Sequence, residues 1–149
     1  MSDQITAEEL AGIKIFSALS AEALAEIADV CRPARYEVDE TIISSRGGNH
    51  DVFFLLHGQA RVVNHTMLGD MVGYGELSEG SYFGELSAID GGPRSAEVEA
   101  VTLCSVAALS PDDFRRTLGR HPDVLFAVMR NLAAMIRRTN LTVLSHATL

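Results

Sequence analysis

The stretch that decides the fold runs from residue 82 to residue 96 and reads Tyr82-Phe83-Gly84-Glu85-Leu86-Ser87-Ala88-Ile89-Asp90-Gly91-Gly92-Pro93-Arg94-Ser95-Ala96. Glu85 and Arg94 stand nine residues apart in it, each among small residues. Arginine offers a phosphate a bidentate, permanently charged partner, and a carboxylate accepts a hydrogen bond from a sugar hydroxyl. By residue chemistry alone, two interpretations remain open: a site for a phosphorylated sugar, or a Glu85–Arg94 ion pair within a loop.

Short runs of β-branched and aromatic residues surround this stretch, with turn residues between them. They occupy residues 41–43, 52–56, 60–63, 71–72, 97–101 and 105–106. Many short strands at close spacing are typical of a small antiparallel barrel or jelly roll. The pattern therefore predicts a mainly β fold, an antiparallel β-roll over residues 35–109, with residues 82–97 inside it.

Helix signals precede the β-rich region in residues 1–34. Thr6 and Glu9 have the spacing of a capping box, and Ser20 is a candidate N-cap for a second helix. The expected buried face of this helix is Leu24, Ile27, Ala28 and Cys31. Pro33 is expected to end it.

Helix signals also follow the β-rich region, in residues 110–149. Ser110-Pro111-Asp112-Asp113 combines an N-cap serine, a proline at the first helical position and acids over the positive helix end. After His121-Pro122 a long helix is expected. Along it an apolar seam advances in steps of four and three, through Leu125, Met129, Leu132, Ile136, Thr139, Val143 and His146. Such a seam is typical of a coiled coil, so a homodimer is favoured over packing of the seam on the roll.

Size and composition fit one globular domain over residues 1–149, with 47% hydrophobic residues and a net charge of −8. This charge argues against nucleic acid as a partner, and the arginines of the last third are interpreted as a solvated helix face. The polar amino terminus is no signal peptide, and no apolar run is long enough to span a bilayer, so a cytoplasmic location is expected. Cys31 and Cys104 stand apart and are expected to be buried free thiols.

Residues 82–96 closely resemble the phosphate-binding cassette of cyclic nucleotide-binding domains, in which F-G-E-[LIV]-A-L precedes a short variable link and P-R-[SAT]-A. The resemblance extends over residues 15–149 to the cAMP receptor protein family, including the entry segment at 15–20, the hairpin at 53–63 and the approach to the cassette at 79–83. It implies the same β-roll with flanking helices that the strand pattern predicts. It further implies a regulatory module that binds cAMP or cGMP, without catalysis, cofactor or metal of its own.

Individual roles follow from the same resemblance. Glu85 would accept from the ribose 2′-hydroxyl and Arg94 would hold an equatorial phosphate oxygen, while Gly84 and Leu86 offer backbone contacts. The other ligand-binding residues implied are Phe83, Ser87, Ser95, Ala96, Tyr74, Val98, Thr139 and Asn140. Of these, Tyr74 and Val98 would lie near the base, and Thr139-Asn140 would reach the adenine amino group from the long helix.

The chain departs from this family in two places. A helix-turn-helix domain follows the long helix in the family, whereas this sequence stops at Leu149, which makes the sensory half of a transcription regulator an alternative, with the effector domain or partner unknown. Tyr74-Gly75-Glu76 stands where more apolar residues are common, which leaves base selectivity in doubt. Ser95 rather than threonine after Arg94 favours cAMP, and a cGMP-selective sensor is the alternative.

Two other classes of protein fit less well. An iron–sulfur redox sensor needs a cysteine cluster, and two isolated cysteines do not make one. A cupin-like metalloenzyme would need His50, His57 and His65 in a metal-binding pattern, but the H-x-H spacing with a partner glutamate is missing.

Overall fold

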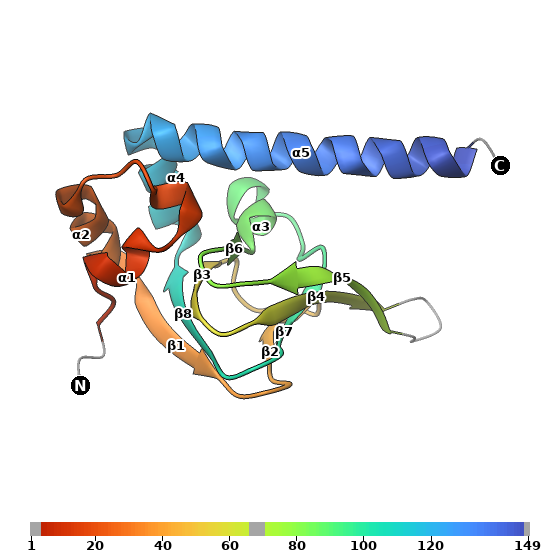
Figure 1. Ribbon diagram of the computed structural model, residues 1–149, viewed down its shortest axis with the longest axis horizontal. Coiled ribbons are helices and arrows are strands. Elements are labelled where there is room, and N and C mark those ends of the chain that lie inside the picture. Colours follow the sequence, from red (N-terminus) through yellow and green to blue (C-terminus); the bar gives the residue numbers. More distant parts are fainter. Residues whose placement is uncertain (1–3, 66–70, 148–149) are drawn as a thin grey trace.

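The computed structural model describes residues 4–65 and 71–147, and within these ranges the side chains of all but residues 64, 65, 71–74 and 141–147. Two antiparallel sheets form a β-roll, helices pack at one end of it, and one long helix runs across it (Figure 1). The predicted fold class is confirmed: a β-roll with N-terminal helices and a long C-terminal helix.

The two sheets have four strands each. One has the order β1-β8-β3-β6, made of β1 (Arg32–Tyr36), β8 (Cys104–Leu109), β3 (Val52–His57) and β6 (Tyr82–Phe83). The other has the order β2-β7-β4-β5, made of β2 (Thr41–Ile43), β7 (Glu97–Ala100), β4 (Ala60–His65) and β5 (Met71–Leu77). Every strand run predicted from the sequence overlaps one of these strands, although the run 97–101 extends one residue past β7. β1 and β6 were not predicted.

The start of the roll differs from the prediction. Helix α2 (Ala21–Val30) ends before Cys31, and β1 already begins at Arg32, with Pro33 inside the strand. β1 lies at the edge of its sheet, where a proline can stand without breaking a ladder between two neighbours. Pro33 was therefore wrongly interpreted as the end of a helix.

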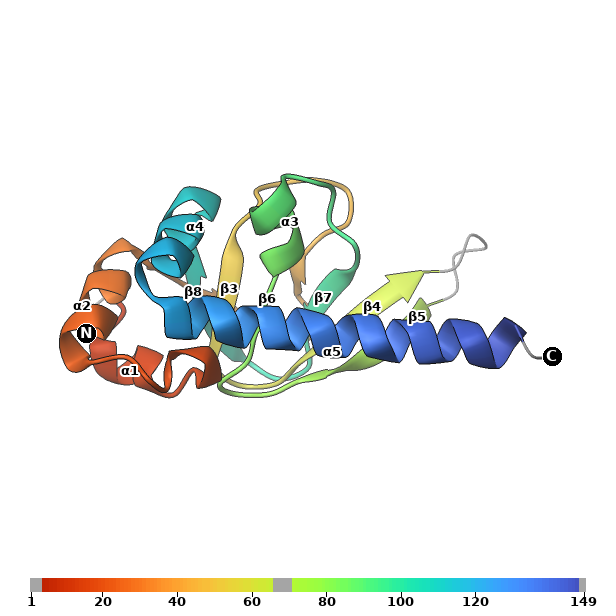
Figure 2. The same ribbon diagram turned by 90° about the horizontal axis from the view of Figure 1, so that it is seen from above.

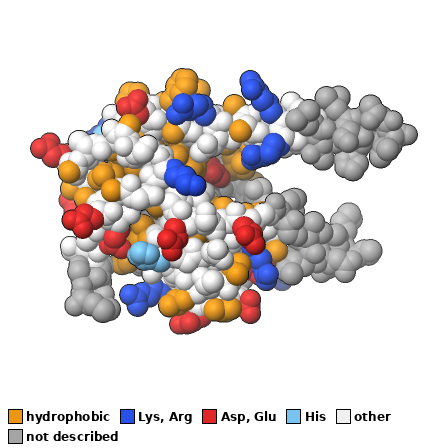
Figure 3. Space-filling view, in the orientation of Figure 1, with side chains coloured by type: hydrophobic (Ala, Val, Ile, Leu, Met, Phe, Trp, Pro, Cys, Tyr) orange, Lys and Arg blue, Asp and Glu red, His pale blue; other side chains and the backbone are white. Residues whose placement is uncertain are grey.

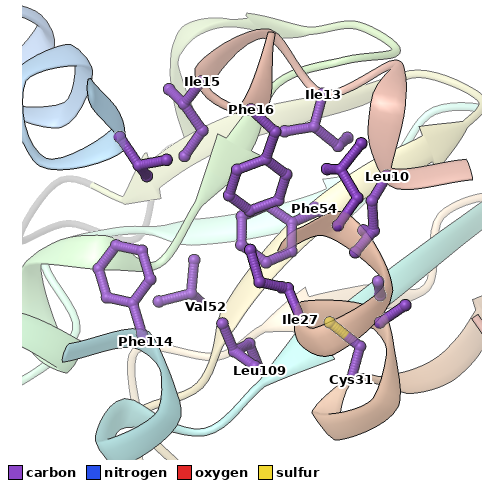
Figure 4. Packing of buried hydrophobic residues seen from close by; sticks show 14 of the residues in the cluster. Leu10, Ile13, Ile15, Phe16, Ile27, Cys31, Val52, Phe54, Leu109 and Phe114 are labelled. Carbon is purple, nitrogen blue, oxygen red and sulfur yellow. The ribbon is translucent and has the colours of Figure 1, made fainter. Parts of the chain in front are cut away.

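Side chains of β3 alternate between two hydrophobic cores, as the two-residue period of a strand requires. Phe54 and its neighbours of the same face pack under the helices, whereas Phe53 and Leu55 point into the roll. In the helix-side core the Phe54 ring lies 4.9 Å from the Phe16 ring, centroid to centroid (Figure 4). This contact packs the η1 segment directly on β3.

The helices begin at the caps that the sequence predicts. The Thr6–Glu9 capping box precedes α1 (Ala7–Ala11), the Ser20 side chain accepts from the backbone N–H of Ala23, and Ser110 caps α4 (Pro111–Arg120). A short 3₁₀ helix, η1 (Lys14–Phe16), lies between α1 and α2. Cys31 and Cys104 are buried free thiols, as predicted, and burial raises the pKa of Cys31 to about 12.

Helix α5 (Pro122–Ala147) buries one face and exposes another. Val124 and Val128 are buried in the helix-side core, and Leu132 packs against it, while Leu125, Met129 and Ile136 are 38%, 53% and 60% exposed. Figure 2 shows α5 crossing the roll from the α4 end towards β4 and β5, with α3 to one side of it. No helix within the described ranges has both the length and the hydropathy of a membrane span.

Candidate functional site

The cassette begins with a left-handed glycine. β6 leads into Gly84, whose φ of 88° precedes α3 (Glu85–Asp90). A Cβ at this position would lie 2.8 Å from the Asp51 carbonyl oxygen and 2.9 Å from Arg94 Nη1. Only glycine fits both the backbone conformation and the space, so this residue brings the start of α3 close to Arg94.

The Arg94 guanidinium lies between Gly84 and the segment 49–51. Its Nη1 donates to the Gly84 carbonyl at 3.0 Å, and its Nη2 donates to the Asp51 carbonyl at 2.9 Å and to Asn49 Oδ1 at 3.4 Å. Burial lowers the pKa of Arg94, and the negative charges of Asp51 and Glu85 act against this. All three of these acceptors are neutral carbonyl oxygens. Among the described residues, Arg94 therefore forms no ion pair with Glu85, which was one of the two interpretations left open by the sequence.

Glu85 is the first residue of α3 and is partly buried. Desolvation raises the pKa of its carboxyl, while hydrogen bonds from the backbone N–H groups of Glu85 and Leu86 and the charge of Arg94 lower it. The carboxylate is therefore held against the helix start, near the arginine but not bonded to it.

Other cassette residues anchor α3 in place. Ser87 and Ala88 are buried, and Ser87 Oγ lies 2.8 Å from His50 Nδ1. The Phe83 ring stacks on Phe53, with centroids 5.6 Å apart. Arg115 Nη1 on α4 donates to the Ala88 carbonyl at 3.2 Å. The cassette helix is therefore attached both to the roll and to α4.

The remaining predicted residues are distributed around the cassette and on α5. Ser95 is exposed, Ala96 is half-buried, and Val98 is buried in the roll opposite Val62. Tyr74 belongs to β5, but its side chain lies outside the described ones, as do those of Val143 and His146 on α5.

Thr139 and Asn140 are exposed on α5, away from the part of the helix that packs on α4 and η1. The Thr139 hydroxyl donates to the Met135 carbonyl of its own helix at 3.0 Å. The structure therefore gathers Gly84, Glu85 and Arg94 but does not bring the α5 pair onto them.

A cavity of about 380 Å³ opens on the far side of Arg94. It lies between β1 and β2 and the segment 44–51, and of the predicted site residues it contains only Arg94. Asn49 and Asp51, which hold Arg94 and line this cavity, were missed because the run 46–49 was interpreted only as a turn. An aspartate directly before a buried strand was the available signal.

Metal binding finds no support within the described residues, which contain no group of three histidine, cysteine or acidic side chains able to hold an ion. His50 instead contacts Ser87, and the His65 side chain lies outside the described ones.

The family model of the cyclic nucleotide-binding domain matches residues 33–121. The chain belongs to this family. It is 35% identical over 114 residues to a cAMP-dependent protein kinase regulatory subunit from Aspergillus niger, covering 76% of this chain and 27% of that protein. It is also 31% identical over 128 residues to Glutaminase 1 from Bradyrhizobium diazoefficiens, covering 86% of this chain and 20% of that protein. The chain thus spans about a quarter of the length of these curated relatives.

The fold is shared with the catabolite activator protein of Thermus thermophilus. The two structures superpose with a TM-score of 0.79 at 24% identity, over 87% of this chain and 61% of that one. This likeness shows that the two proteins share the β-roll fold with its flanking helices.

Proposed function

We propose that this domain binds a 3′,5′-cyclic nucleotide, preferentially cAMP, with the cyclic phosphate at Arg94 and the ribose 2′-hydroxyl at Glu85. One observation carries the proposal: the left-handed turn at Gly84 brings a partly buried arginine and a partly buried glutamate together without pairing them. The relation to a cAMP-dependent kinase regulatory subunit supports the choice of nucleotide.

The charge of Arg94 suits a cyclic phosphate, which carries one negative charge. The guanidinium has five N–H groups, and its three hydrogen bonds leave two of them for a ligand. A partly buried cation bonded only to neutral acceptors gains from an anionic partner, because charge-assisted hydrogen bonds are stronger than neutral ones.

Glu85 supplies the complementary contact. When ionised, its carboxylate acts only as an acceptor and makes stronger, charge-assisted hydrogen bonds, and the 2′-hydroxyl of ribose is a donor. Around these two contacts, we assign backbone and small-residue roles near the sugar and phosphate to Phe83, Gly84, Leu86, Ser87, Ser95 and Ala96. Val98 and Tyr74 would face the base.

Ligand binding is proposed to act on α5. Two contacts connect the cassette region to the C-terminal helices: Arg115 donates to Ala88 of α3, and Asn131 of α5 donates to Tyr82 of β6. In a homodimer formed through the exposed seam residues Leu125, Met129 and Ile136, Thr139 and Asn140 would approach the base. The effector would be a further domain or a partner protein in the cytoplasm.

Titration of the purified domain with cAMP, cGMP and 5′-AMP tests this proposal. The account predicts saturable binding of cAMP, weaker binding of cGMP, and much weaker binding of 5′-AMP, whose open dianionic phosphate has a different shape. Tenfold tighter binding of cGMP would reverse the assigned base preference. Absence of binding of both cyclic nucleotides at millimolar concentration would overturn the function.

A further inference from the structure

The cavity behind Arg94 lies between the edge strands of the two sheets, β1 and β2. β1 lines the cavity with Arg32, Pro33, Ala34 and Tyr36. Arg35 is exposed and is not part of the lining. Phe53, Ile43 and Ala108, three buried residues of the roll core, supply apolar walls. A volume of about 380 Å³ falls within the usual range of small-molecule sites.

The lining carries an unbalanced positive charge. Its charged residues are Arg32, Arg94 and Asp51. The buried Asp51 carboxylate pairs with Arg32, whose side chain is 63% exposed. Among the described residues, Arg94 in contrast donates only to carbonyl oxygens, those of the Gly84 and Asp51 backbone and of the Asn49 side chain. One cationic group in a pocket of mixed polar and apolar lining therefore has no carboxylate hydrogen-bonded to it among the described residues.

We propose that this cavity is a second ligand site, separate from the cassette, for a small organic anion. The ligand would place a carboxylate or phosphate head at Arg94 and Arg32 and an aromatic or short aliphatic body against Phe53 and Ala108. Arginine suits both head groups because its planar fork matches two oxygens. The apolar walls select against inorganic anions, which would leave this surface in contact with water.

The position of Arg94 makes the second site regulatory, provided that the proposed function holds. The same guanidinium borders the cavity and the cassette. An anionic head group in the cavity would therefore partly neutralise the positive charge that the cyclic phosphate would bind. An anion in the cavity then weakens cyclic nucleotide binding, and the nucleotide weakens binding of the anion by the same factor.

Amide chemical-shift titration of the 149-residue domain with phenyl phosphate and benzoate tests the site. Benzyl alcohol, which has the ring but no charge, and inorganic phosphate, which has the charge but no ring, are the control probes. We expect saturable shifts centred on residues 41–49 for the two organic anions, and at least about tenfold weaker binding of both control probes. The affinities of phenyl phosphate and benzoate, compared with each other, show whether the site prefers a phosphate or a carboxylate head group.

Three variants locate the binding. Ala34→Phe fills the cavity and should abolish the shifts at 41–49, with an unchanged spectrum elsewhere as the test of folding. Arg32→Gln should weaken both organic anions about tenfold, whereas Arg35→Gln, on the opposite face of β1, should not. Shifts that persist in Ala34→Phe, or that fall only at residues 84–87 and 95–96, would overturn the proposal.

The same titrations separate this site from the proposed function. Saturable shifts at 41–49 in a protein that binds no cyclic nucleotide would support the cavity and contradict the cassette. Cyclic nucleotide binding without any response to phenyl phosphate or benzoate would contradict the cavity alone.

Discussion

Asn131 Nδ2 on α5 donates a hydrogen bond of 2.9 Å to the hydroxyl oxygen of Tyr82. Tyr82 stands in β6, two residues before the left-handed Gly84. Burial raises the pKa of Tyr82, the hydrogen bond from Asn131 lowers it, and the charge of Glu85 raises it. Figure 3 shows α5 along one side of the molecule, with hydrophobic and basic side chains on its surface. The bond thus ties the entrance of the cassette to the helix that is proposed to move.

Tyr82→Phe removes the hydrogen bond from Asn131 and leaves the aromatic ring in place. Because the bond is neutral and partly exposed, we expect the free energy of unfolding to fall by about 1 kcal/mol or less. Hydrogen exchange of the α5 amides near residue 131 should become faster. Tyr36→Phe is the matched control, since the Tyr36 hydroxyl makes no hydrogen bond with the described residues. Equal exchange in both variants would show that the bond does not restrain α5.

Gly84→Ala should disrupt the cassette more than Gly91→Ala. Both glycines have positive φ, 88° and 72°, so both variants carry backbone strain of about 1 kcal/mol or more. At Gly84 the added Cβ also meets the Asp51 carbonyl at 2.8 Å, whereas at Gly91 nothing lies within 4 Å. Thermal unfolding should therefore show a larger loss for Gly84→Ala. Equal losses would mean that the close approach at Gly84 is not required.

Glu85→Gln should raise the free energy of unfolding and weaken cAMP binding. Burial raises the pKa of Glu85, so between the ordinary glutamate pKa and the raised value the folded state binds more protons than the unfolded chain. The free energy of unfolding of the wild type therefore falls as pH rises through this window. The glutamine variant lacks this loss, and it should be the more stable protein above the window. Denaturant unfolding at several pH values measures the difference, and a wild type that gains stability across the window would contradict it.

The same substitution should weaken cAMP binding. Glutamine keeps a neutral amide oxygen as acceptor, so the loss is the charge assistance, about 1–1.5 kcal/mol, or roughly five- to tenfold in affinity. In the wild type, affinity should fall as Glu85 becomes protonated at low pH, and in Glu85→Gln this dependence should disappear. With 2′-deoxy-cAMP the two proteins should bind alike, because the ligand then has no hydroxyl for the carboxylate. A persistent difference would place Glu85 elsewhere than at the 2′-hydroxyl.

Ile136→Glu tests the dimer through α5. Ile136 is 60% exposed in the monomer, so the substitution should spare the fold while placing two like charges at the predicted two-fold seam. Ala134→Glu introduces the same charge on another face of the helix, where Ala134 is also exposed. Light scattering should report a dimer for the wild type and Ala134→Glu and a monomer for Ile136→Glu. A monomeric wild type at high concentration would contradict the seam.

Most of the fold was predictable because its signals are local. The alternation of apolar residues in β3 and the caps at Thr6, Ser20 and Ser110 each act within a few residues. β1 was missed because Pro33 is a strand breaker except at a sheet edge, and the edge position depends on tertiary structure. β6 was missed because two residues give no periodicity.

Only those residues of the candidate site that belong to the contiguous sequence motif could be predicted. Gly84, Glu85 and Arg94 stand in one contiguous stretch, whereas two of the three groups that accept from Arg94 belong to Asn49 and Asp51, more than 40 residues earlier in the chain. Their hydrogen bonds use a side-chain amide and a backbone carbonyl, and a backbone carbonyl has no signature in the sequence. The cavity beside Arg94 escaped prediction for the same reason, since its walls come from strands that meet only in the folded roll.

Calorimetric titration of cAMP into wild type, Arg94→Ala and Arg35→Ala tests the central claim most directly. Arg94 is half-buried at the cassette, and Arg35 is an exposed arginine of β1, so both variants lose one positive charge but only one loses the proposed phosphate partner. The account predicts that Arg94→Ala weakens cAMP binding by about 2 kcal/mol or more, roughly 30-fold, while Arg35→Ala binds like the wild type. Equal affinity of all three proteins for cAMP would contradict a phosphate site at Arg94.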